Sequence, residues 1–203
     1  FHLKMGEGVL IAREDTTVLV ETATKLIQTK QAAILDLCAG TGAVGLGIAS
    51  LLSTVNVTCV EKYAPAFAYL QQNIALCKEQ GIENVAALQG DILSEAFASA
   101  FQDIDAIVSN PPYIETAVLP TLQEEVQKEP TTALDGGEDG LLFYRAIADI
   151  WIPKMKTGCI VAVEIGEGQE TDVARIFSNA GIEQIQFEKD SGNIIRVVAG
   201  IKK

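Results

Sequence analysis

Asn110 begins a short segment, Asn110–Tyr113, in which an amide side chain is followed by two prolines and a tyrosine. Prolines fix their own φ angles and have no N–H, so this segment leaves the preceding strand as a stiff loop. The side-chain oxygen of Asn110 and the backbone carbonyl of Pro111 are then two acceptors without competing donors. Two such acceptors can hold a planar NH₂ group and favour the pyramidal nitrogen that attacks a methyl donor, while Tyr113 stacks on that group or orients it.

The same four residues in isolation are more often a structural turn, so their context decides. Asp36 ends a predicted strand and precedes glycines in G-x-G-x-x-G spacing, Gly40, Gly42 and Gly45. Glycines at a strand-to-helix turn let a ligand approach the backbone closely, and the following helix offers unpaired N–H groups. Alone, this spacing also indicates only a tight turn.

Two further acids change that interpretation. Glu61 ends the second predicted strand, where folds of this type bind a ribose diol, and Asp91 ends the third, where a carboxylate can accept from an adenine amine. Each acid alone is as often a helix cap. Because the carboxyl ends of parallel strands share one edge of a sheet, Asp36, Glu61, Asp91 and Asn110 are expected to converge on one crevice.

The acids also favour one class of ligand. A dinucleotide needs N–H groups for its pyrophosphate and usually a second nucleotide-binding half, whereas an adenosine with a sulfonium tail suits acids along its length. Asp36 matches a cationic amino-acid tail better than a pyrophosphate. The sequence therefore favours S-adenosylmethionine over NAD as cofactor.

Strand-like and helix-like segments alternate along most of the chain, which predicts right-handed crossovers and a parallel sheet covered on both faces. The final segment, 182–200, reads instead as a hairpin around Ser191 and Gly192. The predicted fold is Rossmann-like α/β: a mostly parallel seven-stranded sheet with an antiparallel C-terminal hairpin. Residues 115–139 have no strong periodicity and are a candidate functional flap.

Size, charge and cysteine usage limit the class of protein. The 203 residues, 48% hydrophobic and 21% charged, suit one domain spanning 1–203. A net charge of −12 opposes a phosphate backbone, so direct nucleic-acid binding is not expected. The four cysteines form no C-x-x-C pair, which predicts buried reduced thiols, and the single histidine, His2, disfavours a Ser-His-Asp centre. The same cysteine pattern makes a zinc site improbable, and no metal is expected in the reaction. With neither a membrane-length apolar run nor a signal peptide, the sequence predicts a cytoplasmic enzyme.

The sequence closely resembles the HemK/PrmC family of S-adenosylmethionine-dependent protein-(glutamine-N5) methyltransferases, which modify peptide chain release factors. The resemblance covers essentially the whole chain and is carried by GVLIAREDT, DLCAGTGAVG, NPPYI, EPTTALDGGEDGLLFYR, VEIGEGQ and DSGNIIRVVAG. NPPY is shared with DNA and RNA amino-methyltransferases and so specifies only an amide or amine nitrogen. The ALDGGEDGLLFYR segment is much more particular to the release-factor enzymes.

This resemblance implies a class I S-adenosylmethionine-dependent methyltransferase fold and a role for each candidate residue. Gly40 and Gly42 would line the methionine tail of the cofactor, Glu61 would hold the ribose and Asp91 would contact the adenine. Asn110 and Pro111 would bind the acceptor amide, with Tyr113 beside it. The implied acceptor is the glutamine of a Gly-Gly-Gln loop in a class 1 release factor, and the products are N5-methylglutamine and S-adenosylhomocysteine.

The match departs from the family pattern at three places. The family often has P-R-P-E-T-E near the start; here AREDTT keeps Arg13, Asp15 and Thr16 but not the residues at positions 12, 14 and 17. Cys38 replaces a common glycine, which is tolerable if that position does not need a positive φ. The helical N-terminal domain that helps such enzymes dock the release factor is absent from these residues.

Three alternatives stay open. An N6-adenine or N4-cytosine nucleic-acid methyltransferase shares the acceptor geometry, but it needs a basic groove and stacking aromatics, and only 6% of the residues are aromatic. A glutamine methyltransferase of a ribosomal protein ranks below the release-factor enzyme because of ALDGGEDGLLFYR. A non-catalytic adenosine-binding module is the remote third, since it has no use for an oriented acceptor pair.

Overall fold

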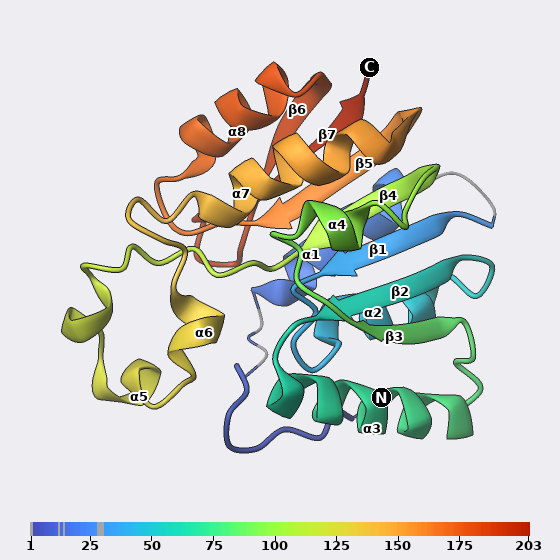
Figure 1. The fold of residues 1–203 in the computed structure, drawn as a ribbon, viewed down its shortest axis with the longest axis horizontal. Coiled ribbons are helices and arrows are strands. Elements are labelled where there is room, and N and C mark those ends of the chain that lie inside the picture. The colour runs from blue at the N-terminus through green and yellow to red at the C-terminus, as the bar shows by residue number, and fades with distance from the viewer. Residues whose placement is uncertain (1, 12, 14, 28–30) are drawn as a thin grey trace.

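The computed structural model describes residues 2–11, 13, 15–27 and 31–203. In this part of the chain seven strands form one sheet in the order β3-β2-β1-β4-β5-β7-β6 (Figure 1). The strands are β1 (Ala33–Leu37), β2 (Asn56–Glu61), β3 (Val85–Gln89), β4 (Ile104–Ser109), β5 (Met155–Glu164), β6 (Ile182–Lys189) and β7 (Ile195–Lys202). β1 to β5 pair in parallel, whereas β7 runs antiparallel to both β5 and β6. The predicted mostly parallel seven-stranded sheet with its C-terminal hairpin is confirmed.

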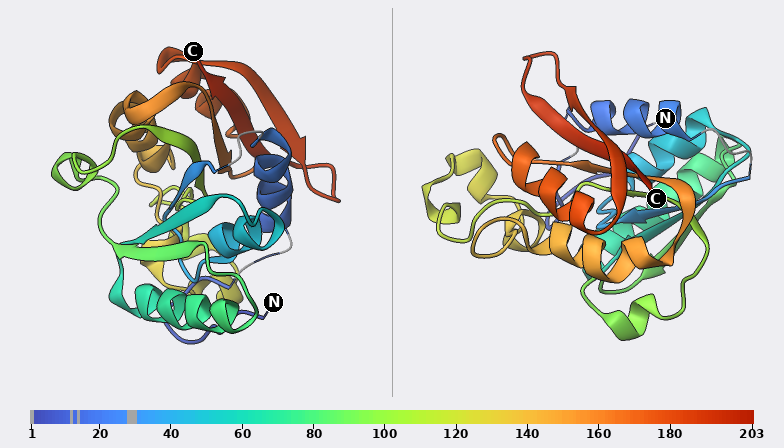
Figure 2. Two further views of the ribbon diagram at one scale, coloured as in Figure 1. Left: turned by 90° about the vertical axis from the view of Figure 1, so that its right-hand side faces the viewer. Right: turned by 90° about the horizontal axis from the view of Figure 1, so that it is seen from above.

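The central strands are apolar on both faces because helices cover both. In β4, Ile107 and Val108 point to opposite sides and are both fully buried, each in a different hydrophobic cluster. One face packs against α1 (Thr16–Leu26), α2 (Ala43–Leu51) and α3 (Ala64–Glu79). The other packs against α4 (Glu95–Ala98), α7 (Leu142–Ala146) and α8 (Glu170–Asn179), as the right-hand view of Figure 2 shows.

The helical segment from Leu142 to Lys154 is a regular α-helix only in its first part, α7. After α7 the backbone widens into a π-helical turn, η2 (Ile147–Trp151), and then tightens into a 3-10 turn, η3 (Ile152–Lys154). Pro153 cannot donate an N–H to the preceding turn, so the regular α-helical ladder does not continue through it. The change of pitch leaves Trp151 fully buried, with its indole N–H donating to the Ile92 carbonyl at 2.8 Å.

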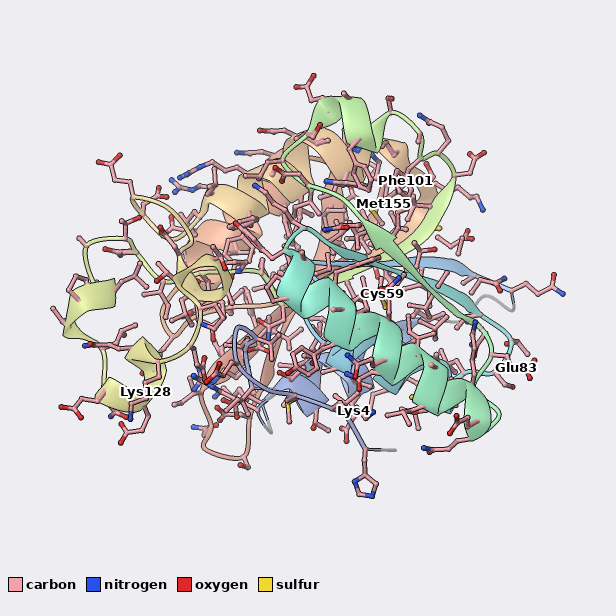
Figure 3. All side chains as sticks on the ribbon, turned by 60° about the horizontal axis from the view of Figure 1, so that its bottom comes forward. Lys4, Cys59, Glu83, Phe101, Lys128 and Met155 are labelled. Atoms are coloured by element: carbon pink, nitrogen blue, oxygen red, sulfur yellow. The ribbon has the colours of Figure 1, made fainter. Side chains whose placement is uncertain are left out.

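The candidate flap is built from short helical turns: η1 (Leu119–Thr121), α5 (Glu124–Gln127) and α6 (Thr131–Leu134). Its far end returns to the loop after β4, where the Ile114 N–H donates to the Leu134 carbonyl at 2.9 Å and the Gly136 N–H donates to the Ile114 carbonyl at 2.8 Å. In Figure 1, α5 and α6 project beyond the carboxyl edge of the sheet. In Figure 3, Lys128 on this flap lies far from Glu83, which precedes β3 at the amino edge.

Other expectations from the sequence are met in part. Each cysteine is free within the described residues; Cys59 and Cys77 are buried as predicted, but Cys38 and Cys159 are only partly buried. β3 ends at Gln89, so Asp91 lies two residues beyond the strand and not at its last position. Over the described ranges, no helix combines the length and apolar character that crossing a bilayer requires.

Candidate active site

The glycine turn after β1 forms the floor of a cleft at the carboxyl edge of the sheet. Gly40 adopts a φ of 57° and Gly42 a φ of 92°, a left-handed conformation that glycine enters without a steric penalty. A Cβ on Gly40 would meet no described atom within 4 Å because this residue faces the cleft. A Cβ on Gly42 would lie 2.7 Å from the Leu70 side chain, so Gly42 serves packing at the start of α2 and does not itself line the cleft.

Cys38 lies in the same turn. Its φ is 60°, so the condition under which a cysteine would easily replace the family's glycine, a position without positive φ, is not met. For a residue with a Cβ this conformation costs about 1–2 kcal/mol. The thiol lines the cleft, where burial is the largest of the effects that raise its pKa, followed by the charges of Glu61, Asp36 and Asp91. It is therefore a neutral wall of the cleft and not a reactive thiolate.

The conformational cost at Cys38 can be measured by comparing two truncations. Both Cys38→Gly and Cys38→Ala remove the thiol, but only the alanine variant keeps a Cβ at positive φ. We expect the glycine variant to be more stable by about 1 kcal/mol, or about 2–4 °C in melting midpoint for a chain of this size. Equal stability of the two variants in urea titrations would show that the turn relaxes freely.

Glu61, the last residue of β2, is fixed by the backbone around it. Its side chain is 6% exposed, and its two oxygens accept from the Gly40 N–H at 2.8 Å and the Tyr63 N–H at 2.7 Å. Burial raises the pKa of Glu61, although the hydrogen bonds from Tyr63, Gly40 and Lys62 counteract part of the shift. Each carboxylate oxygen keeps a further lone pair, so the group can still accept from a pair of hydroxyls in the cleft.

Asp91 lies on the other side of the same cleft. One of its oxygens accepts from the Leu93 N–H at 3.0 Å, and the other pairs with the Lys62 ammonium at 2.8 Å. Burial acts to raise the pKa of Asp91, but the hydrogen bonds from Lys62 and Leu93 and the charge of Lys62 outweigh it, so the pKa is lowered. The residue thus presents a fixed anion to a ligand.

The cleft encloses about 740 Å³ of space between atoms, including the solvent-filled space at its open mouth. Its walls are largely apolar, formed by Val60, Ala66, Ile92, Leu93, Pro112 and Phe143. Gly40, Glu61, Asp91 and Asn110 supply polar groups along its length. Flat apolar walls with acids placed to accept from hydroxyls and an amine fit an adenosine, so the residues present suit S-adenosylmethionine.

Asp36, like Gly42, is a candidate that the structure does not bring to the cleft surface. It is completely buried beneath the glycine turn, where one oxygen accepts from the Gly45 N–H at 2.8 Å and the Cys59 thiol at 3.8 Å. Its other oxygen has no hydrogen-bond partner among the described residues. Burial raises the pKa of Asp36 to about 7 against the opposing hydrogen bonds from Gly45 and Cys59. In this geometry it satisfies an N–H in the first turn of α2, and a role toward a cofactor stays a prediction.

A second hollow, of about 680 Å³, adjoins the first. Asn110, Pro111 and Tyr113 all line it, which brings together the three residues predicted to bind an acceptor. The two hollows share Asn110, together with Leu10 and Ala133. A donor bound in the first cleft and an acceptor bound in the second would therefore meet at the Asn110 side chain.

The loop from Asn110 to Tyr113 is held from several sides. The Ser109 hydroxyl donates to the Leu37 carbonyl at 2.6 Å, which ties the end of β4 to β1. The Gln169 side-chain amide donates to the Tyr113 carbonyl at 3.0 Å, and its oxygen accepts from the Gly166 N–H at 2.9 Å. Burial raises the pKa of Tyr113 to about 12, with the Glu164 charge adding to the effect, so its hydroxyl stays neutral and the ring serves as a wall of the hollow.

Thr16 and Glu164 are functional candidates that the sequence analysis did not single out. Thr16 begins α1 and Glu164 ends β5. Both line the second hollow and are nearly buried, Thr16 at 6% and Glu164 at 3% exposure. The Thr16 hydroxyl donates to Glu164 Oε2 at 3.0 Å, and Asn110 Nδ2 donates to Thr16 Oγ1 at a longer 3.4 Å. Both residues stand inside the motifs that carry the family resemblance, which was the available signal. Ala12 and Glu14, near Thr16 in the chain, lie outside the described residues.

Comparisons with known proteins agree with this geometry. The profile of the methyltransferase small domain family matches residues 14–143. The release factor glutamine methyltransferase of Clostridium acetobutylicum is 35% identical over 207 residues, which cover 100% of this chain and 70% of that protein. The release factor glutamine methyltransferase of Clostridium botulinum is 36% identical over 204 residues, with the same two coverages.

A solved structure shows the same fold at much lower identity. The crystal structure of a methyltransferase from Pyrococcus furiosus superposes with a TM-score of 0.70 at 16% identity, covering 98% of this chain and 88% of that one. The chain therefore belongs to the HemK/PrmC family of release factor glutamine methyltransferases.

Proposed function

We propose that this protein transfers the methyl group of S-adenosylmethionine to the side-chain amide nitrogen of the glutamine in the Gly-Gly-Gln motif of a class 1 peptide chain release factor. The observation that carries this proposal is the meeting of two hollows at Asn110. The first is shaped for an adenosine, and the second presents acceptors for an NH₂ group. The release factor as partner is supported by the names of the relatives, and the cytoplasm as the place of reaction is part of the same proposal.

Binding and orientation supply the catalysis in this proposal. Glu61 accepts from the ribose hydroxyls, Asp91 accepts from the adenine amine, and Gly40 leaves room for the methionine tail. When bound, the cofactor supplies an electrophilic methyl group on a positively charged sulfur. Asn110 Oδ1 and the Pro111 carbonyl accept hydrogen bonds from the two N–H groups of the glutamine amide. This keeps the amide nitrogen in line with that methyl group.

The reaction is then a direct displacement without a covalent enzyme intermediate. The carbon–nitrogen bond forms as the carbon–sulfur bond breaks, and the methylated nitrogen, now acidic, loses a proton to water. Fixing the two reactants in a closed site can lower the barrier by roughly 7 kcal/mol or more in favourable cases. The neutral Tyr113 ring excludes water from one side of the amide.

The second hollow also fits the shape of the proposed acceptor. A Gly-Gly-Gln segment carries no side chain on the two residues before the glutamine, so the main chain can approach the rim while the glutamine side chain enters. Pro111 and Ile114 border the hollow with apolar atoms, so the aliphatic part of a glutamine side chain has surface to cover.

The direct test is incubation of the protein with labelled S-adenosylmethionine and a purified class 1 release factor, followed by mass mapping of the modified peptide. We expect one methyl group on the Gly-Gly-Gln glutamine and no label when that glutamine is replaced. Parallel reactions contain single-stranded and duplex oligonucleotides and purified ribosomal proteins. Label on one of these and not on the release factor would reject the proposal in favour of that acceptor class.

A further inference from the structure

We propose that Glu164, acting through Thr16, sets which end of the Asn110 carboxamide faces the acceptor hollow. The two are positioning residues: they act on the reaction through Asn110. The kinetic test of this inference rests on the function proposed above, whereas the NMR test does not.

The direction of the two hydrogen bonds that link Asn110, Thr16 and Glu164 follows from which of these side chains carries a proton to donate. An ionised carboxylate can only accept, so the one hydroxyl proton of Thr16 goes to Glu164 Oε2 at 3.0 Å. A Thr16 lone pair is then left to accept from Asn110 Nδ2 at 3.4 Å. Both Thr16 and Glu164 are buried, so bulk water competes poorly for these groups.

The consequence is a defined polarity for Asn110. Its NH₂ end is drawn toward Thr16 and Glu164, which turns Oδ1 toward the hollow, where an incoming NH₂ group needs an acceptor. The two ends of a carboxamide are nearly identical in shape, so packing alone does not choose between orientations related by a 180° flip. The negative charge of Glu164 selects the orientation in which the Asn110 NH₂ group points toward Thr16.

Protonation of Glu164 removes that choice. A carboxylic acid can donate its proton to Thr16 Oγ1, and the Thr16 hydroxyl can then donate to Asn110 Oδ1 after the amide has flipped. The Asn110 NH₂ would then face the hollow and meet the NH₂ of the acceptor, a donor against a donor. The carboxylate form of Glu164 is therefore the productive one.

The surroundings place this protonation within an accessible pH range. Burial raises the pKa of Glu164 to about 7; the hydrogen bond from Thr16 and the charge of Arg196 lower it, while the charge of Asp15 adds to the increase. The other titratable groups around it are Tyr113 and Tyr144, whose hydroxyl donates to the Glu164 carbonyl at 3.0 Å, and Arg13 and Glu167 of the same hollow.

Stability and turnover should respond to this group in opposite directions. The pKa of Glu164 is raised in the folded state above its ordinary value of 4.5, so folding favours the protonated form. Its contribution to stability is complete at low pH and is lost as the pH rises toward about 7. Turnover should instead rise over the same interval. A purely structural role for Glu164 does not give this opposition.

The activity test measures kcat against pH at saturating cofactor and acceptor. We expect kcat of the unaltered protein to fall on the acidic side by at least about twofold and then to level off near the value of Glu164→Gln, with little change in the KM for the cofactor. Glu164→Gln should lose this acidic limb and lower the plateau by at least about twofold, the value for two equally populated amide orientations. Thr16→Val should lower kcat, and Thr16→Ser, which keeps the hydroxyl, should restore both kcat and the limb. An unchanged acidic limb in Glu164→Gln would overturn the inference.

The second test needs no acceptor. The side-chain NH₂ signals of Asn110, identified by their absence in Asn110→Ala, are followed by ¹⁵N–¹H NMR as the pH changes. They should titrate near neutrality in the unaltered protein and in an Asp36→Asn control, which removes the other carboxyl whose pKa lies at about 7. They should stay constant in Glu164→Gln. A flat profile in the unaltered protein overturns the inference, whereas absence of release-factor methylation alone overturns only the proposed function.

Discussion

Replacing Asn110 with alanine should lower kcat by roughly a hundred- to a thousandfold, the effect of removing one preorganised hydrogen-bonding group from a reaction centre. Asn110 lines both hollows, and under the proposed function its side chain gives the acceptor nitrogen its direction. Cofactor affinity should change little, because Glu61 and Asp91, which also line the first cleft, are unaltered. Single-turnover methyl transfer and calorimetry with S-adenosylmethionine separate the two effects.

The matched control is the same substitution at Asn56. That residue is exposed at the start of β2, on the amino edge of the sheet, far from both hollows. Asn56→Ala should leave turnover and cofactor affinity as they are. If Asn110→Ala also retained full turnover, the amide would have no part in the reaction, and the proposed acceptor pair would be wrong.

The second large effect is expected from Gly136→Ala. A Cβ at this position would lie 2.7 Å from Tyr113 Cα, 2.8 Å from Tyr113 C and 2.9 Å from the Gly140 carbonyl oxygen. These are backbone atoms, so no side-chain rotation relieves the contact, and the loop that carries Asn110 must shift. A misplacement of about 1 Å in a reacting group can cost about a hundredfold in rate, and overpacking costs about 1–3 kcal/mol of stability.

This variant tests whether the flap positions the loop. Gly136 lies where the flap returns to Ile114, so the expected pattern is a large loss of kcat with cofactor binding retained. Gly192→Ala, in the turn of the C-terminal hairpin, is the control, because there a new Cβ would meet no backbone atom within 4 Å, and its nearest described neighbour is a side-chain oxygen, Asp190 Oδ1, at 3.2 Å. Normal turnover in Gly136→Ala would show that the flap yields and that the loop is held from elsewhere.

The sheet was predictable because its strands are short apolar runs with helices between them. β1, β2 and β4 carry apolar residues on both faces, which is typical of a covered parallel sheet. The turn residues Ser191 and Gly192 predicted the hairpin. The convergence of Glu61, Asp91 and Asn110 followed from the same pattern, since parallel strands end at one edge. Local sequence was sufficient for these features.

The remaining features depend on contacts between distant segments. Asp36 was expected in the cleft, but the first turn of α2 uses its carboxylate and covers it. The positive φ of Cys38 depends on the path of the whole turn, and a thiol at that position gave no sign of it. Thr16 and Glu164 are 148 residues apart, and no periodicity links a helix start to the end of a strand at that distance.

The place of β7 in the sheet makes the two hollows depend on different lengths of the chain. Every residue that lines the first cleft lies between Gly8 and Phe143, whereas the second also needs Glu164, on β5, and Arg196, on β7, which pairs with Asp15 at 3.4 Å. Residues up to position 143 thus supply the whole lining of the first cleft, whereas the lining of the second hollow is gathered from chain positions as far apart as Leu10 and Arg196.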